Sequence, residues 1–193
     1  MKSYSHKLTF FGKLANWLDR PSGSKVDRLI ADLHRKKNES WKVKGKLIRM
    51  GSIAVDPLIK TLNSEGDSFV KWQAAKALAS IGDPKAIPSL IEMLKDHSLV
   101  RYANYGNDAY IYQVAIEALS AMGRPGLDSL IKALSDPFSS RHVRLLVAIE
   151  LGNIGDTRAI PALSKACRVD DDLAVRSRAT SALESIKLVR KGI

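Results

Sequence analysis

Hydrophobic positions along the chain recur as two short helical stretches followed by a glycine. The segment 80–96 (SIGDPKAIPSLIEMLKD) returns as 153–170 (NIGDTRAIPALSKACRVD), and three degenerate copies accompany them. Each copy is followed by a second apolar stretch, such as FVKWQAAKALASIG at 69–82. A repeat of two helices with a period of about 30–40 residues indicates a stack of helix pairs, because one pair alone cannot bury its apolar face.

Glycine closes four of the five repeats, and Lys187 takes the equivalent place in the fifth. The glycines are Gly51, Gly82, Gly123 and Gly155. A helix often ends in left-handed backbone, which glycine adopts at little cost. Counting back from this residue, positions one, four, eight and twelve lie on one helical face and are apolar in the last four repeats. In the third repeat they are Met122, Leu119, Ala115 and Ile111. This face predicts the core.

We therefore predict an all-α protein, a right-handed α-solenoid of about five helix pairs with an N-terminal capping helix. The predicted array occupies 24–193, with units at 24–51, 52–82, 83–123, 124–155 and 156–187. The third unit is longer than the others, and we place its excess in a loop at 97–106. Residues 1–23 form an amphipathic helix and a join, which we expect to cap the open end of the core, although such a helix also suits an anionic membrane surface.

The segments GDPKAIPSLIEMLKD and AIEALSAMG resemble the HEAT-like repeat of the phycobilisome-lyase type. The resemblance covers about residues 24–187 and implies a short α-solenoid. It implies that Asp83 and Asp156, before the first helices, support Arg144 and Arg176, which open second helices. The lyase relatives act on bilin chromophores, so the resemblance also implies a lyase-like chaperone of a chromophore.

Recognisable catalytic motifs do not occur in the sequence. It has no His-Glu dipeptide of the kind that holds iron in the HEAT-like hydroxylases, no phosphate-binding loop and no nucleophile elbow. One cysteine, Cys167, excludes an internal disulfide and a multi-cysteine metal site. We expect no enzyme, no cofactor and no metal.

The same features predict a cytoplasmic protein. The sequence shows no apolar run near twenty residues and no secretory signal, so we expect no transmembrane segment. A lone cysteine fits a reducing compartment.

Positive charge gathers in the first quarter of the chain. Of the net charge of +11, the first 50 residues carry +9, from thirteen Lys/Arg and four Asp/Glu. A basic end on a nearly neutral array indicates a polyanionic partner, whether nucleic acid, an anionic membrane or an acidic protein. A solvated end that serves solubility has the same composition.

Two groups of residues are candidates for binding. The long third unit carries Arg101, Tyr102, Tyr105, Tyr110 and Tyr112, and insertions in solenoids often form the binding face. The alternative is that these tyrosines pack back on the stack.

The second group is Trp41 and Trp72, each ten residues before its glycine, with Lys42, Lys44 and Lys76 on the same two helices. Aromatic rings among lysines bind single-stranded nucleic acid or an acidic peptide. The alternative is that both tryptophans only pack between repeats.

The functional hypothesis is a non-enzymatic scaffold that binds a protein partner through its inner groove and the tyrosine-rich loop. Nucleic-acid binding through the basic N-terminal part of the groove is the alternative. A lyase-like chromophore chaperone is the third. The sequence leaves the oligomeric state open.

Overall fold

The computed structural model describes residues 24–35, 37–65, 67–95 and 108–191. Within these ranges the chain is helical and contains no strand. The first helices of successive pairs are α2 (Lys25–Arg35), α4 (Ser52–Leu62), α6 (Ile87–Lys95), α8 (Arg124–Ser135) and α10 (Ile160–Val169). The second helices are α3 (Ser40–Arg49), α5 (Ser68–Ile81), α7 (Asp108–Ala121), α9 (Arg141–Ile154) and α11 (Leu173–Lys191). The predicted N-terminal helix and the loop at 97–106 lie outside the described residues.

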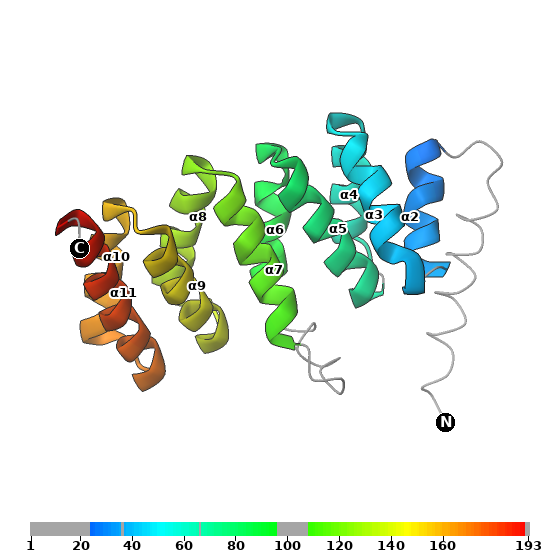
Figure 1. Ribbon diagram of the computed structural model, residues 1–193. Helices are drawn as coiled ribbons and strands as arrows, with labels where there is room; N and C mark the ends of the chain where they lie inside the picture. Colours follow the sequence, from blue (N-terminus) through cyan, green and yellow to red (C-terminus); the bar gives the residue numbers. More distant parts are fainter. Residues whose placement is uncertain (1–23, 36, 66, 96–107, 192–193) are drawn as a thin grey trace, which may run out of the picture.

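The helix pairs stack side by side in two layers (Figure 1). Each first helix contacts the first helix of the next pair, and each second helix likewise contacts the next second helix. The second helices pack together more extensively than the first helices do. This arrangement confirms the predicted α-solenoid.

The predicted core face is buried in the second helices. Leu78, Leu119 and Leu151, four positions before their glycines, are all 0% exposed. The small residues at position eight, Ala74 and Ala115, are also 0% exposed, so neighbouring helices approach closely there. Three predicted core residues, Ile81, Ile154 and Leu183, are only half-buried, and the first two are the last residues of α5 and α9.

The four repeat glycines all have positive φ, as predicted, but they close their helices in two ways. Gly82 and Gly155 are left-handed C-caps. Each is followed by an aspartate, Asp83 or Asp156, whose side chain caps a short 3-10 turn, η2 (Pro84–Ala86) or η4 (Thr157–Ala159).

Gly51 and Gly123 instead combine positive φ with extended ψ and lead directly into α4 and α8. A residue with a side chain rarely adopts either conformation.

A further glycine, Gly126, marks a close approach between α8 and α7. A Cβ atom on Gly126 would lie 1.8 Å from the carbonyl oxygen of Leu119. Contact at that distance is impossible without moving backbone, so α8 can lie against α7 only if residue 126 is glycine.

We predict opposite effects of two Gly→Ala substitutions on the free energy of unfolding, measured by urea denaturation. Gly126→Ala should destabilise the protein by about 1–3 kcal/mol, because the new methyl group forces the two helices apart. Gly45→Ala, in α3, should stabilise it by up to about 1 kcal/mol, because a Cβ there meets nothing within 4 Å and alanine favours the helix. Equal or greater stability of Gly126→Ala would contradict the packing described here.

Candidate ligand-binding surface on the second-helix layer

Trp41 and Trp72 occupy equivalent positions on α3 and α5, two second helices that contact each other. The Trp41 side chain is 65% exposed, whereas Trp72 is half-buried and packs against the core. Phe69 supports Trp72, with ring centroids 5.8 Å apart. Trp72 therefore serves partly in packing, as the alternative allowed, and Trp41 does not.

Two lysines lie against these indole rings. The Lys76 ammonium is 4.5 Å from the centroid of Trp72, and the Lys42 ammonium is 5.5 Å from that of Trp41. Both distances are within the range of cation–π attraction. Lys42 also pairs with Glu39 at 2.9 Å, so part of its charge is already compensated.

Lys44 is half-buried on α3. Partial burial lowers its pKa below the ordinary lysine value, and the nearby charge of Lys76 lowers it further. Neither Lys44 nor Lys76 forms an ion pair with a carboxylate in the described part of the chain. We refer to Trp41, Trp72, Lys42, Lys44 and Lys76 as the Trp–Lys surface.

A buried hydrogen bond links the two helices of this surface. The Gln73 amide donates to the Ser40 hydroxyl at 2.7 Å, and both side chains are buried. Because the bond joins α3 to α5, it holds their tryptophans and lysines in register. Sequence reasoning missed Gln73, although a glutamine directly before the buried alanines of α5 was a visible signal.

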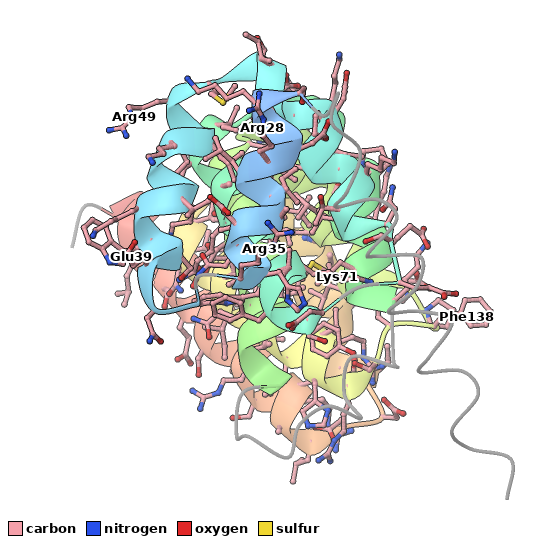
Figure 2. All side chains as sticks on the ribbon, turned by 90° about the vertical axis from the view of Figure 1, so that its right-hand side faces the viewer. Arg28, Arg35, Glu39, Arg49, Lys71 and Phe138 are labelled. Atoms are coloured by element: carbon pink, nitrogen blue, oxygen red, sulfur yellow. The ribbon has the colours of Figure 1, made fainter. Side chains whose placement is uncertain are left out.

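The basic end of the chain forms the exposed end of the array. Figure 2 looks along the array from this end, with Arg28 and Arg35 on α2 and Glu39 and Arg49 beside them. All four side chains are exposed. Arg28, Arg35 and Arg49 therefore place positive charge on the end of the array that α2 and α3 form.

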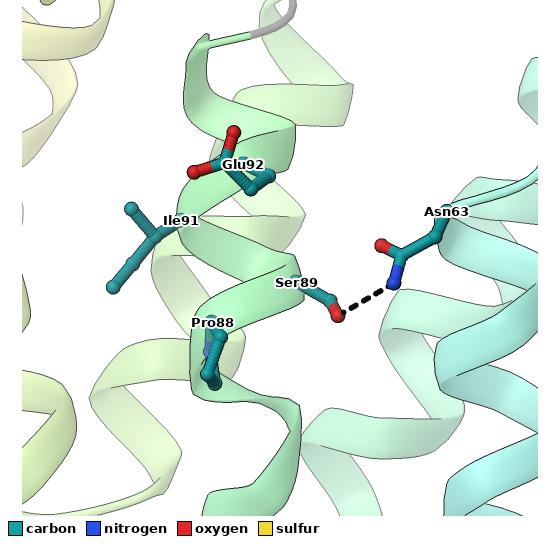
Figure 3. Close-up of a pocket in the computed structure, with 5 residues that line it drawn as sticks. All are labelled: Asn63, Pro88, Ser89, Ile91 and Glu92. Atoms are coloured by element: carbon teal, nitrogen blue, oxygen red, sulfur yellow. Dashed lines mark hydrogen bonds between the residues drawn. The ribbon is translucent and has the colours of Figure 1, made fainter.

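Two depressions lie on the described residues, and the Trp–Lys surface lines neither of them. One, of about 420 Å³, lies over α6 and the end of α4 (Figure 3), where the Asn63 amide donates to the Ser89 hydroxyl at 3.1 Å. The other, of about 270 Å³, lies between α8 and α10. A ligand on the Trp–Lys surface would thus bind an open face.

The structure describes only some of the residues in the tyrosine-rich group. Arg101, Tyr102 and Tyr105 lie outside the described residues, and Tyr110 belongs to α7 without a described side chain. Tyr112 is 2% exposed and belongs to the core. Its burial agrees with the alternative in which the tyrosines pack back on the stack.

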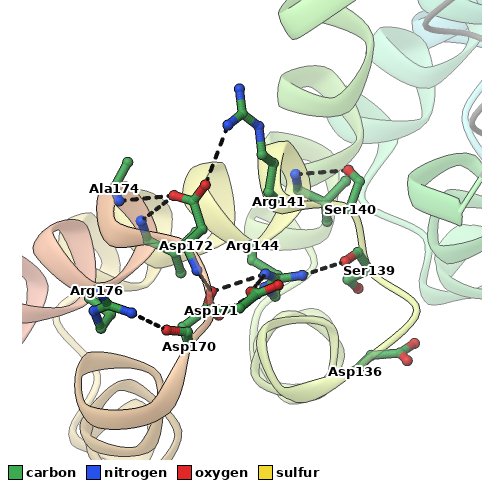
Figure 4. A network of polar contacts seen from close by, with 12 residues as sticks. Asp136, Ser139, Ser140, Arg141, Arg144, Asp170, Asp171, Asp172, Ala174 and Arg176 are labelled. Carbon is green, nitrogen blue, oxygen red and sulfur yellow. Dashed lines mark hydrogen bonds and ion pairs between the residues drawn. The ribbon is translucent and has the colours of Figure 1, made fainter.

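Arg144 is the centre of a polar network between the fourth and fifth pairs (Figure 4). Its guanidinium donates to Asp170 at 2.8 and 2.9 Å, to Asp171, and to the Ser139 carbonyl at 2.7 Å. Arg176 donates to the Asp170 carbonyl. Burial raises the pKa of Asp170, but hydrogen bonds, above all from Arg144, outweigh burial and hold it below the ordinary value.

The resemblance implied different partners for these arginines. Asp156 pairs with Arg158 and caps its backbone amide, and Asp83 caps the amide of Lys85. Neither aspartate bonds to Arg144 or Arg176. These two arginines instead donate hydrogen bonds to Asp170, in the loop before α11.

Comparison with known proteins places the chain among helical-repeat proteins. It matches the family of HEAT repeats over residues 27–106 and 103–184. It is 30% identical over 147 residues to the bilin biosynthesis protein PecF of Nostoc sp. strain PCC 7120, over 72% of this chain and 82% of PecF. The chain thus belongs to the HEAT-repeat proteins. Within them it belongs to the family of PecF.

A solved structure agrees with this assignment at the level of the fold. The complex of CpcE and CpcF of phycocyanin lyase from Nostoc sp. PCC7120 matches with a TM-score of 0.51 and 24% identity, over 87% of this chain and 68% of that one. The comparisons give no support to the nucleic-acid alternative. Among the described residues, no helix is long and apolar enough to cross a membrane, and no three His, Cys, Asp or Glu side chains gather as a metal site.

We predict that Arg144→Met destabilises the protein by roughly 3 kcal/mol at pH 7, because it leaves the buried carboxylate of Asp170 unpaired. Arg158→Met is the matched control, since Arg158 is 37% exposed and its pairs with Asp128 and Asp156 lie at the surface. The control should cost much less, because ion pairs at the surface contribute little to stability. Urea denaturation of both variants measures the difference.

The same network predicts a pH dependence. The folded-state pKa of Asp170 is depressed, so its stabilisation is complete above the ordinary carboxyl pKa of about 3.9 and is lost as the pH falls through the lower folded value. The stability difference between wild type and Arg144→Met should therefore shrink below about pH 4. A difference that stays constant from pH 7 to pH 3 would contradict the role of this pair.

Proposed function

We propose that this protein binds a bilin on the Trp–Lys surface and presents it to a protein partner, as a chaperone of the lyase type. The relationship to PecF points to a bilin. The observation that carries the proposal is the Trp–Lys surface itself, with an exposed indole and two half-buried lysines on adjacent helices. A bilin is a flat conjugated tetrapyrrole with two carboxylates, so it suits both the rings and the charges.

The openness of this surface supports a role for a second protein. A bilin lying on α3 and α5 keeps one face in solvent, because the described depressions lie elsewhere. A partner that covers the exposed face would complete the site. The structural neighbour is itself a complex of two proteins, which supports this part of the proposal. The scaffold and chaperone hypotheses thus become one, in which the ligand lies between two proteins.

The chemistry of the surface favours binding and orientation over bond formation. Indoles supply stacking, and ammonium groups supply positive charge. A covalent step would draw its reacting groups from the bilin and from the protein that receives it. The relationship to a bilin biosynthesis protein nevertheless weighs against the expectation, drawn from the sequence, that this protein is not an enzyme.

We predict that biliverdin, titrated into the full chain, shows a shifted absorbance band and quenches tryptophan fluorescence. Trp41→Ala should weaken binding about two- to tenfold, because it removes the exposed stacking ring. Phe138→Ala is the matched control, since Phe138 is 81% exposed in the loop between α8 and α9 and should not change the affinity. No spectral change with wild type, or equal losses in both variants, would contradict the proposed function.

A further inference from the structure

Lys44 and Lys76 stand out among the lysines of the array by their surroundings. Three described lysines pair with a carboxylate: Lys42 with Glu39, Lys85 with Asp56 at 3.8 Å, and Lys95 with Glu92 at 3.0 Å. Lys44 and Lys76 are half-buried, and within the described chain they form no such pair.

Holding these two ammonium groups together is unfavourable in the free protein. Each lies one helical turn beyond a partner of the Gln73–Ser40 bond, Lys44 four residues after Ser40 and Lys76 three residues after Gln73, so they lie on adjoining faces of α3 and α5. Partial burial and the charge of Lys76 both lower the pKa of Lys44. The fold keeps them together, since Lys44 comes from α3 and Lys76 from α5, and the Gln73–Ser40 bond joins those helices. An anion that bridges both groups would relieve the repulsion and replace lost hydration.

A bilin carries its two carboxylates in a matching arrangement. They end the propionate chains of the two middle rings, so both project from one edge of the molecule. Lys76 also lies over the face of Trp72, which places a positive charge beside an aromatic ring. A ligand that combines a conjugated plane with two neighbouring carboxylates meets both features at once.

We propose that Lys44 and Lys76 form a carboxylate clamp that binds the two propionates of the bilin, while the indoles contact its conjugated plane. This inference rests on the proposed function and adds to it a selectivity for the charged carboxylates of the ligand. The site takes the free dicarboxylic acid and discriminates against tetrapyrroles whose carboxylates are neutralised. The clamp spans the contact between the first and second helix pairs, so the ligand bridges two repeats.

The test compares biliverdin with biliverdin dimethyl ester, in the same co-solvent, on the full chain. Wild type should bind the free acid at least tenfold more tightly than the ester, because the ester forms neither charge-assisted contact with the lysines. In the double variant Lys44→Met, Lys76→Met, the affinity for the acid should fall to that for the ester, and the affinity for the ester should stay unchanged. Methionine keeps the apolar stem, and a thermal melt checks that the variant is folded.

Lys85→Met is the matched control, because Lys85 lies in η2, outside the Trp–Lys surface, and its ammonium pairs with Asp56. It should change the affinity for the acid by no more than twofold. Equal binding of acid and ester by wild type would overturn the clamp and leave the proposed function standing. A loss in Lys85→Met as large as in the double variant would also overturn it, in favour of a general effect of charge. Binding of neither compound would overturn both proposals.

Discussion

The burial of apolar faces between successive helix pairs is the constraint on which the rest of the structure depends. Each pair is amphipathic and stable only against its neighbours, so fully buried leucines such as Leu78, Leu119 and Leu151 repeat at every contact. Close approach then needs small residues. Gly126 against Leu119, and Gly152 with a Cβ position 2.9 Å from Ala182, are the points where this need is strictest.

The candidate site follows from this packing. Because α3 and α5 are in contact, the equivalent residues Trp41 and Trp72 lie on neighbouring helices. The same contact brings Lys44 near Lys76. Lys44 of the first repeat takes the place that Ala75, Ile116 and Ala148 occupy in the next three repeats. The array thus places charge and aromatic surface at its basic end and keeps its regular apolar packing elsewhere.

Much of the fold could be predicted from the sequence, because its signals are local and repeated. The spacing of Gly51, Gly82, Gly123 and Gly155 and the apolar face counted back from them gave the helix pairs and most of the core. What failed depended on contacts between distant residues. Arg144 meets Asp170 across 26 positions through the shape of the loop before α11, and no periodicity reveals that shape. Tyr112 belongs to the core, although the sequence grouped it with a predicted surface loop.

The site itself could be predicted in part. Residue types and repeat register brought Trp41, Trp72 and the lysines together. The distinction among those lysines needed the structure, because only coordinates show that Lys42 has a carboxylate partner and that Lys44 and Lys76 are each other's neighbours. The Gln73–Ser40 bond beneath them depends on side-chain directions across two helices, which sequence spacing does not specify.

Hydrogen–deuterium exchange of the full chain with and without biliverdin tests the central claim most directly, since it reports where the ligand binds without any substitution. The account predicts that amides of α3 and α5 gain protection, while those of α10 and α11, at the far end of the array, exchange as before. Protection confined to α8 and α10, around the other depression, or no protection at saturating biliverdin, would contradict it.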